Sequence, residues 1–384
     1  MKKLFFTFFL LALGVLGWWY FQPRALPDYG PSYREYAYVT NGKSKSVTVI
    51  DLRTFEPAKT IPVGIDPTGL AANSKKNEVY VVNAGSSNVS VINAERNAVV
   101  ATIGVHGKPY FIDVSADGKR GYVANSESAN VSVIDLEKRA VIATISVGKS
   151  PGLARVSPDG NTVVVSNRED NTVSVIDTAR LAVRSTIPVC RQPEDIAILP
   201  DNSKAFIACA GSAQVAAIDL TNGTLLALLD VGKTPVNLVL KPDGGELMVT
   251  NFDSDNISII ETTTNEVSGS YLIGDHPSRG VVTADNSRLY VSNFGSDDVA
   301  VYDIDLGKLI ASIAVGSHPD GLALSQSQNY LLVLDSASGD VTVIQKREPT
   351  KLEPTEYSLL TMIPAGAKPN NIVVKSFVLS QPAK

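Results

Sequence analysis

Two cysteines, three histidines and a few carboxylates are the residues of this chain whose chemistry goes beyond packing. Cys190 and Cys209 are its only cysteines, 19 residues apart. They could form a disulfide, remain two inert thiols, or act as a reactive or metal-binding pair. His276 and His318 each precede a proline. Such a histidine pair with a carboxylate could bind a metal, and one axial histidine could bind haem.

No motif in the sequence assigns a reaction to these residues. The chain lacks a Cys-x-x-Cys-His haem attachment site, a Gly-x-Ser-x-Gly nucleophile elbow and a phosphate-binding loop. Glu194, Asp195 and Asp320 could act as paired carboxylates, but their separation in space decides that role. We therefore predict no catalytic residue and no metal ligand from sequence.

The composition excludes several classes of protein. Charged residues make up 19% of the 384 residues and the hydrophobic set 44%, which excludes a disordered chain. The net charge of −5 disfavours nucleic acid as the main partner, because a phosphate-binding surface needs excess Lys and Arg. Two cysteines are too few for a disulfide scaffold or a Cys-rich zinc protein.

Residues 1–30 have the pattern of an export signal. Lys2 and Lys3 precede an apolar run over residues 4–21, broken only by Thr7. As a helix this run would be about 27 Å long, close to the hydrocarbon thickness of a bilayer. It is either a cleaved signal peptide or an uncleaved membrane anchor. Both alternatives place residues 31–384, which we expect to form a single domain, in the periplasm or at the cell surface.

The rest of the chain is one repeat of 42 residues. A Tyr-Val-x-Asn element recurs with its last residue at Asn41, Asn83, Asn125, Asn167, Cys209, Asn251, Asn293 and Asp335. Prolines follow the same period at Pro67, Pro109, Pro151, Pro193, Pro235, Pro277 and Pro319, and an eighth follows at Pro369 after eight extra residues within 346–358. Each unit contains four short Val/Ile/Thr-rich segments separated by turns, which indicates an all-β fold. Four strands in about 42 residues are typical of a β-propeller blade.

The order of the strands predicts eight blades. The second, third and fourth strands of the unit occur eight times, starting near residue 36, and the eighth first strand comes last, after Pro369. The N-terminal three strands and the C-terminal strand would together form one composite blade that closes the ring. The alternative is seven complete blades over 67–368 with the terminal strands packed outside.

The repeat resembles the YVTN family of β-propellers. The Tyr-Val-x-Asn, Val-Ser-Val-Ile-Asp, Thr-Ile-x-Val-Gly and Pro-x-Gly-Leu elements recur across residues 31–384. The family includes archaeal surface-layer proteins and exported bacterial propellers. The wider group resembles haem-d1-carrying domains of nitrite reductases, β-subunits of quinohaemoprotein amine dehydrogenases and seven-bladed lactonases. The resemblance implies the fold, while the motif residues themselves build the blade.

Departures from the repeat point to function more than the repeat does. A glycine precedes most of the prolines by three residues, and we expect it to permit a backbone conformation that other residues resist. Cys190 replaces this glycine in one unit and Cys209 replaces the asparagine on the other side of the same inner strand. We therefore expect a Cys190–Cys209 disulfide, which an exported location permits.

The loops beside each proline should gather at one mouth of the central channel, where propellers usually bind ligands. Their side chains are polar, of mixed charge and different in each unit, which suits a binding site. The predicted ligand-binding residues are Tyr110, Arg168, Arg191, Glu194, Asp195, Asn237, Phe252, His276, Arg279, Phe294, His318 and Asp320. The leading function is a non-enzymatic exported propeller that binds a protein, glycan or small ligand. The alternatives are a redox propeller with haem d1-like or quinone cofactor, and a lactonase-type hydrolase. No cofactor is required by the sequence.

Overall fold

The computed structural model describes residues 30–347 and 356–379. Residues 34–377 form one compact unit. The described residues at the two ends belong to a second, small unit, in which the backbone amide of Leu379 donates to the carbonyl of Ser32. Within the described ranges no helix is long and apolar enough to cross a membrane. The predicted leader over residues 4–21 lies outside the described residues.

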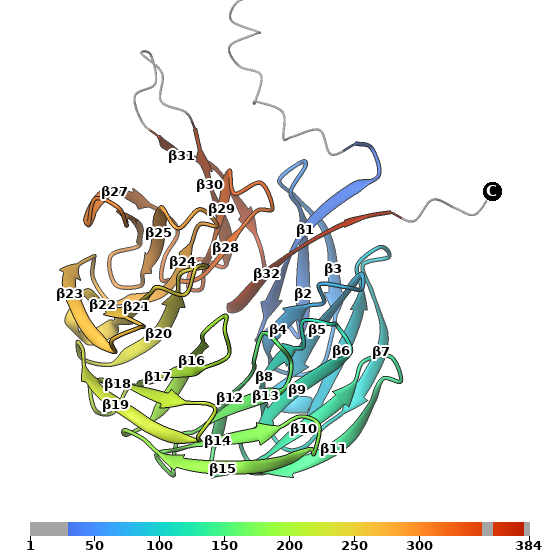
Figure 1. Cartoon of the computed structure of the whole chain (residues 1–384). Coiled ribbons are helices and arrows are strands. Elements are labelled where there is room, and N and C mark those ends of the chain that lie inside the picture. Colours follow the sequence, from blue (N-terminus) through green and yellow to red (C-terminus); the bar gives the residue numbers. More distant parts are fainter. Residues whose placement is uncertain (1–29, 348–355, 380–384) are drawn as a thin grey trace, which may run out of the picture. The chain divides into compact units, whose positions relative to one another are not determined.

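The unit over residues 34–377 is a ring of eight blades, each a four-stranded antiparallel sheet (Figure 1). The prediction of an all-β, eight-bladed propeller is confirmed, and the seven-bladed alternative is wrong. The innermost strands are β4 (Pro67–Ala72), β8 (Pro109–Val114), β12 (Pro151–Val156), β16 (Pro193–Ile198), β20 (Pro235–Leu240), β24 (Pro277–Val282), β28 (Pro319–Leu324) and β32 (Pro369–Val378).

Three further strands complete each blade toward the outside. The second strands are β1 (Tyr33–Asn41), β5 (Glu78–Asn83), β9 (Arg120–Asn125), β13 (Thr162–Asn167), β17 (Lys204–Cys209), β21 (Glu246–Asn251), β25 (Arg288–Asn293) and β29 (Tyr330–Asp335). The third strands are β2 (Ser46–Asp51), β6 (Asn88–Asn93), β10 (Asn130–Asp135), β14 (Thr172–Asp177), β18 (Gln214–Asp219), β22 (Asn256–Glu261), β26 (Asp298–Asp303) and β30 (Asp340–Lys346). The outer strands are β3 (Glu56–Pro62), β7 (Ala98–Gly104), β11 (Ala140–Ser146), β15 (Ala182–Pro188), β19 (Thr224–Asp230), β23 (Glu266–Leu272), β27 (Lys308–Ala314) and β31 (Tyr357–Pro364). Two 3-10 turns, η1 (Ala84–Ser86) and η2 (Phe252–Ser254), follow β5 and β21.

The composite blade closes the ring as predicted. Its strand order is β3-β2-β1-β32, so the C-terminal strand is innermost, and Figure 1 shows β32 in red beside the blue β1. The β32 side chains also hold both neighbouring blades. Asn370 donates to the carbonyl of Pro67 at 2.8 Å, and the buried Lys375 ammonium donates to the carbonyl of Asn73 at 2.6 Å. Ser376 bonds Gln326 in the preceding blade at 3.2 Å. The pairing of β32 with β1 covers the strand edge that an open ring would expose, and the side-chain bonds tie the closing blade to both neighbours.

The hydrophobic core lies between the faces of adjacent blades. Every residue of β5 is buried, and Tyr80 packs in one apolar cluster with Val91 of its own blade and with Ile112 and Val123 of the next. Both faces of the second strand are covered, so these strands are continuously apolar where a half-exposed strand would alternate. Burial of each large side chain stabilises the ring by roughly 1.5–3 kcal/mol.

The glycine that precedes each proline is required by close packing, not by an unusual φ. Gly64, Gly148 and Gly232 have no left-handed φ, and only Gly274 does, at 153°. A Cβ on Gly148 would lie 2.6 Å from Cγ of Asn167, the asparagine 19 residues later. Our prediction of a backbone conformation that only glycine adopts is therefore wrong at most of these positions. The reason is steric, because the asparagine side chain lies flat against the glycine.

The asparagine paired with each glycine bonds side chains of the third strand. Asn83, the partner of Gly64, donates from Nδ2 to Asn88 Oδ1 at 2.8 Å and to Ser90 Oγ at 2.9 Å. One blade replaces this whole arrangement, because Cys190 and Cys209 occupy the two slots and Ala216 takes the place of the serine. The two cysteines form a buried disulfide with a Cα–Cα distance of 5.6 Å, which confirms the prediction.

A repeated clamp fixes the loops at the mouth of the channel. The residue before each proline has a left-handed φ of 51° to 54°, including His276 and His318. Its carbonyl accepts a bond from the residue that follows the second strand, as in Phe294 N to His276 O at 2.9 Å and Arg168 N to Ser150 O at 3.3 Å. The scaffold therefore presents two side-chain positions per blade in nearly the same geometry while their identities vary.

Candidate functional site

All eight innermost strands contribute to one central cavity of about 260 Å³ at the channel. It combines charged, amide, aromatic and aliphatic side chains. Its lining is Thr68, Tyr110, Phe111, Leu153, Arg155, Arg168, Glu194, Asp195, Val236, Asn237, Arg279, Gly280, Asp320, Gly321, Leu322, Asn370, Asn371 and Ile372. Such a concave site with a few convergent polar groups is the usual form of a small-molecule site.

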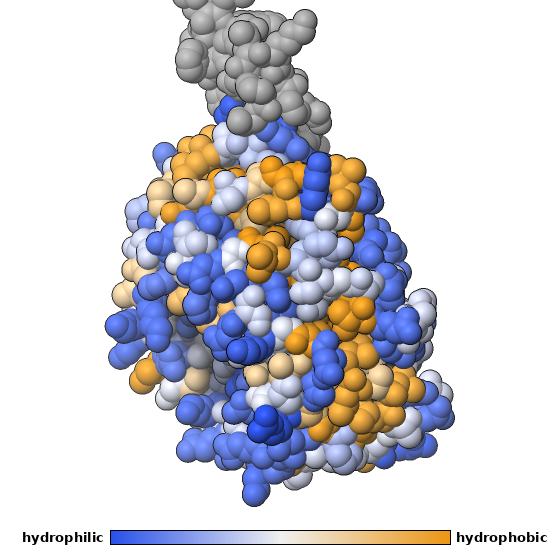
Figure 2. Space-filling model, turned by 90° about the vertical axis from the view of Figure 1, so that its left-hand side faces the viewer, coloured by the Kyte–Doolittle hydropathy of each residue, from blue (hydrophilic) through white to orange (hydrophobic). Residues whose placement is uncertain are grey.

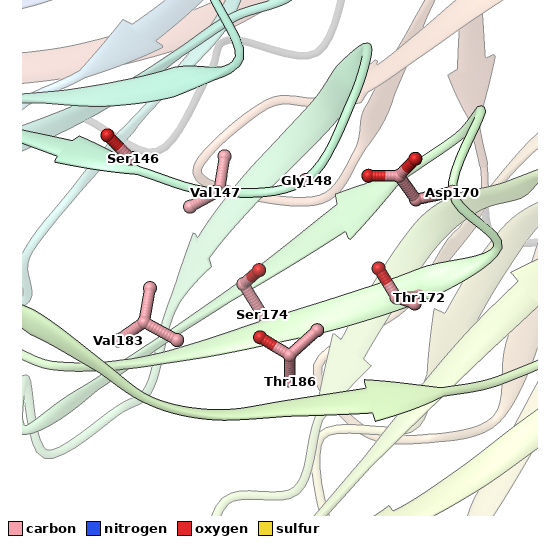
Figure 3. Close-up of a pocket in the computed structure, with 8 residues that line it drawn as sticks. All are labelled: Ser146, Val147, Gly148, Asp170, Thr172, Ser174, Val183 and Thr186. Atoms are coloured by element: carbon pink, nitrogen blue, oxygen red, sulfur yellow. The ribbon is translucent and has the colours of Figure 1, made fainter.

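A second hollow of about 590 Å³ lies away from the channel, between outer parts of two blades. Figure 3 shows it bordered by Ser146 to Gly148 on one side and by strands β14 and β15 on the other. Its one charged side chain, Asp170, already accepts a bond from the amide of Lys149 at 2.6 Å. Small side chains and one occupied carboxylate offer little for recognition, so the central cavity is the candidate site despite its smaller volume.

An arginine–carboxylate pair forms one side of the cavity. The Arg168 guanidinium bonds the Glu194 carboxylate at 2.7 Å and lies over the Tyr110 ring at 4.5 Å from its centroid. Burial raises the pKa of Glu194, and the charge of Arg168 opposes that shift. Both side chains are part-exposed, about a quarter to a third, so the pair is accessible from the channel. Glycine at position 152 makes room for it, because a Cβ there would lie 2.6 Å from Arg168 Nε.

A second charged group ties neighbouring inner strands together. Asp195, only 4% exposed, accepts bonds from the amide of Leu238 at 3.0 Å and from Asn237 Nδ2 at 2.7 Å. Arg155 pairs with Asp195 at 3.5 Å and lies over the Phe111 ring at 4.8 Å. Phe111, Arg155, Asp195 and Asn237 thus contact one another across four neighbouring blades. Their role is to hold the walls of the cavity together.

The third part of the cavity wall is formed by Arg279, Asp320 and Asn371. It differs from the other two parts because these polar side chains have no partner in the described part of the chain. Over residues 30–347 and 356–379, no hydrogen bond or ion pair reaches the Arg279 guanidinium, the Asp320 carboxylate or the Asn371 side-chain amide. Burial raises the pKa of Asp320, and the charge of Arg279 lowers it. These three side chains lie on the consecutive inner strands β24, β28 and β32.

A row of aromatic rings lies in the loops next to β21, β24, β25 and β28. His276 packs against Phe252 at 4.6 Å, Phe252 against Phe294 at 5.9 Å, and Phe294 is stacked on His318 at 4.4 Å with an interplanar angle of 13°. His276 Nδ1 also lies 2.5 Å from Asp275 Oδ1. Asp255, Asp275 and His276 have ligand atoms within 4.8 Å of one another and are the described residues that could hold a metal ion.

The structure brings most of the predicted binding residues together. Seven line the cavity, namely Tyr110, Arg168, Glu194, Asp195, Asn237, Arg279 and Asp320. Four form the aromatic row, namely Phe252, His276, Phe294 and His318. Arg191 is exposed and joins neither group. That these residues bind a ligand stays a prediction.

Sequence reasoning missed Phe111, Arg155 and Asn371. Arg155 had a usable signal, since the same repeat slot is alanine or valine in six other blades and is charged again only in the preceding blade, at Asp113. A charged residue in a mostly apolar slot of an inner strand must face a partner or the channel. Asn371 had a signal too, since it occupies the same slot of the predicted closing strand as Asp195, Asn237 and Arg279 do in theirs.

Comparison with known proteins relates the chain to two groups of propellers. Residues 19–156 match the family model of the YNCE-like β-propeller. Residues 274–364 match the model of the seven-bladed β-propeller lactonases. No curated protein sequence matches the chain.

Several solved structures are similar to it. Hydrazine synthase of Kuenenia stuttgartiensis is 23% identical with a TM-score of 0.61, over 74% of this chain and 97% of that one. The dihydro-heme d1 dehydrogenase NirN, in complex with DHE, is 15% identical with a TM-score of 0.72, over 88% and 74%. A functionally unknown protein from Desulfotomaculum acetoxidans DSM 771 is 17% identical with a TM-score of 0.60, over 88% and 98%. At these identities the likeness establishes the fold alone.

Proposed function

We propose that this β-propeller is an exported, non-enzymatic binding protein whose ligand occupies the central cavity at the channel mouth. The observation that carries the proposal is the convergence of eight different inner strands on one cavity of about 260 Å³. The repeat itself needs none of the cavity's charged side chains, because uncharged residues such as Gly152, Val236 and Ser278 fill most of the corresponding slots in other blades. Their presence at one place is therefore what binding would require.

The location follows from the disulfide and the leader together. Disulfides persist in oxidising compartments such as the periplasm and the cell surface. The buried Cys190–Cys209 bridge supports such a location, and the apolar run over residues 4–21 is the means of export that we propose. A small ligand fits the cavity, and a protein or glycan could use its rim.

Native mass spectrometry and ligand-induced thermal stabilisation test this function. We expect the purified full-length protein to carry or take up a small molecule that raises its melting temperature. Tyr110→Ala and Glu194→Gln should each lower the apparent affinity for that molecule at least about tenfold and so reduce the shift in melting temperature, since each removes a group that faces the cavity. Lys138→Gln, on an exposed outer turn, is the matched control and should leave the shift unchanged. Equal shifts in all variants would contradict binding in the cavity.

A redox propeller is the second candidate. Its support is the likeness to NirN in complex with DHE and the row of His276, Phe252, Phe294 and His318 at the mouth. A histidine could supply an axial ligand and the rings a stacking surface for haem, and a quinone could use the same surface. This candidate predicts a visible absorption band after purification or after addition of haem, and loss of that band in His276→Ala or His318→Ala. A colourless protein that takes up no haem counts against it.

A lactonase-type hydrolase is the third candidate. The lactonase match covers Arg279 and Asp320, two charged residues of the cavity without a described partner. Hydrolysis of a lactone panel, lost in Asp320→Asn or Glu194→Gln, would support it. Absence of turnover in the presence of demonstrated ligand binding would leave the binding function in place.

A further inference from the structure

We propose that the ligand of the central cavity is a small zwitterion, namely an α-amino acid with an apolar side chain. This inference rests on the binding function proposed above and names its ligand class. It follows from which charges of the cavity are already paired, which are not, and what surrounds the unpaired ones.

The charges of the cavity wall balance, which excludes a strongly anionic ligand. Three arginines, at 155, 168 and 279, face three carboxylates, at 194, 195 and 320. Two of each are paired within the wall, as Arg168 with Glu194 and Arg155 with Asp195. The guanidinium of Arg279 and the carboxylate of Asp320 remain without an ion pair, although the charge of Arg279 acts on Asp320. A ligand that pairs with both must carry one group of each sign.

The two remaining charges lie on neighbouring strands. Arg279 lies on β24 and Asp320 on the next inner strand, β28. A guanidinium binds a carboxylate with two parallel N–H···O bonds, while an aspartate accepts from an ammonium group. The two strands belong to neighbouring blades and are in contact, since the Ser278 hydroxyl on β24 donates to the carbonyl of Pro319 on β28 at 3.1 Å. The α-carboxylate and α-ammonium of an amino acid are separated by one carbon, which suits a donor and an acceptor on two such strands. Asn371 on β32 adds an amide that could bond either group.

The apolar part of the cavity suits the side chain of the ligand. Phe111, Leu153, Val236, Leu322 and Ile372 line it together with the charged groups. Its volume of about 260 Å³ is just below the range of drug-sized sites and fits a molecule smaller than these. A polar sugar would leave both unpaired charges without a charged partner and would cover this apolar wall poorly.

Calorimetric titration of the full-length protein with L-leucine and two matched analogues tests the inference. Leucinamide keeps the ammonium and lacks the carboxylate, and N-acetyl-L-leucine keeps the carboxylate and lacks the ammonium. We expect L-leucine or a similar amino acid such as L-valine or L-phenylalanine to bind. We expect each matched analogue to bind at least about 30-fold more weakly, because each lacks one of the two charged groups that Arg279 and Asp320 would bind.

Two variants assign each contact separately. Arg279→Gln should weaken binding of L-leucine and make its affinity equal to that of leucinamide, because the guanidinium that would bind the carboxylate is gone. Asp320→Asn should make the affinity for L-leucine equal to that for N-acetyl-L-leucine, because the carboxylate that would bind the ammonium group is gone. Lys138→Gln, on an exposed outer turn away from the cavity, is the control and should bind as the wild type does.

The outcomes separate this inference from the function on which it rests. If apolar amino acids do not bind, but another class of small molecule binds and loses affinity in Tyr110→Ala, the inference fails and the binding function stands. If no class binds and no ligand co-purifies, both fail. Binding of L-leucine that is unchanged in both Arg279→Gln and Asp320→Asn would also overturn the inference.

Discussion

Replacing Asp335 by asparagine should stabilise the protein, and the gain should grow as the pH rises. Asp335 occupies the slot of the repeated asparagine and is fully buried. Its Oδ2 accepts from the Thr342 hydroxyl at 2.6 Å, and its Oδ1 has no partner in the described part of the chain. Burial, assisted by the nearby Asp340, raises the pKa of Asp335 to about 8. A protonated Asp335 can donate toward Asp340, as Asn293 donates to Asp298 at 2.6 Å in the preceding blade.

The raised pKa fixes the sign and the size of the effect. The folded state holds a proton that the unfolded state releases near the ordinary value of 3.8. The stabilising contribution is therefore complete below pH 4 and is lost as the pH rises toward 8. Each pH unit in this window lowers the free energy of unfolding by about 1.4 kcal/mol. The largest possible loss between pH 5 and pH 8 is therefore about 4 kcal/mol. Because relaxation and water entry lower such penalties, we expect Asp335→Asn to gain about 2–4 kcal/mol on the wild type over this interval.

Urea unfolding at pH 5, 6, 7 and 8, followed by far-ultraviolet circular dichroism, measures this difference. The matched control is Asn293→Asp, which creates the same carboxyl pair with Asp298 and should lose stability increasingly as the pH rises. A difference between Asp335→Asn and wild type that is the same at pH 5 and pH 8 would refute the reasoning, since it would mean that Asp335 does not change ionisation on folding in this range.

Three other perturbations test the fold. Reduction of the disulfide should lower the free energy of unfolding by about 3 kcal/mol, as expected for a loop of this length. The triple variant Cys190→Gly/Cys209→Asn/Ala216→Ser, which restores the repeat, should recover at least half of that in urea titrations; equal loss in both would argue against the glycine–asparagine equivalence. Gly148→Ala should cost about 1–3 kcal/mol through its contact with Asn167, while Gly104→Ala, with no atom within 4 Å, should stay within about 0.5 kcal/mol by the same assay. Deleting residues 369–384 should abolish the single cooperative thermal transition, and a retained transition would show that β32 does not close the ring.

The register of the repeat made the fold predictable, because a period of 42 residues fixes strand number, strand order and blade count together. The position of the disulfide was predictable for the same reason. Two slots that contact each other in one blade contact each other in all, as the distances from Gly148 to Asn167 and from Cys190 to Cys209 show. The physical role of the glycine was not predictable from sequence. A position with φ above zero and a position with no room for a Cβ atom both select glycine.

The candidate site was predictable only as far as loop positions allow. Seven of the predicted residues line the cavity, but which residues beside a proline face it depends on side-chain direction. Arg191 and Glu194 are three residues apart in one loop and strand, yet only Glu194 lines the cavity. The pairing of Arg168 with Glu194 joins two neighbouring blades, and no pattern within a single unit of the repeat contains it.

The outer surface gives less reason to place a ligand than the channel does. Figure 2 shows apolar side chains in separate groups on one side of the ring, interrupted by hydrophilic ones. Leu226 and Leu228 on β19 and Leu309 on β27 are examples, each 44–45% exposed. Outer strands of a propeller have one neighbour instead of two, so partial exposure of their alternate residues follows from the fold.

Strand β32 both closes the ring and lines the proposed binding site, so ligand binding should affect the stability of the closed ring. Asn371, one of the three side chains of the cavity without a partner in the described residues, lies on β32, which holds the first and last blades together. A ligand that contacts both Asn371 and Asp320 on β28 can bind only the closed ring. It therefore stabilises the closed ring by mass action, by about 2.7 kcal/mol at a hundredfold excess over its dissociation constant. The same ligand cannot stabilise a chain that lacks β32, so thermal stabilisation reports on binding and on closure together.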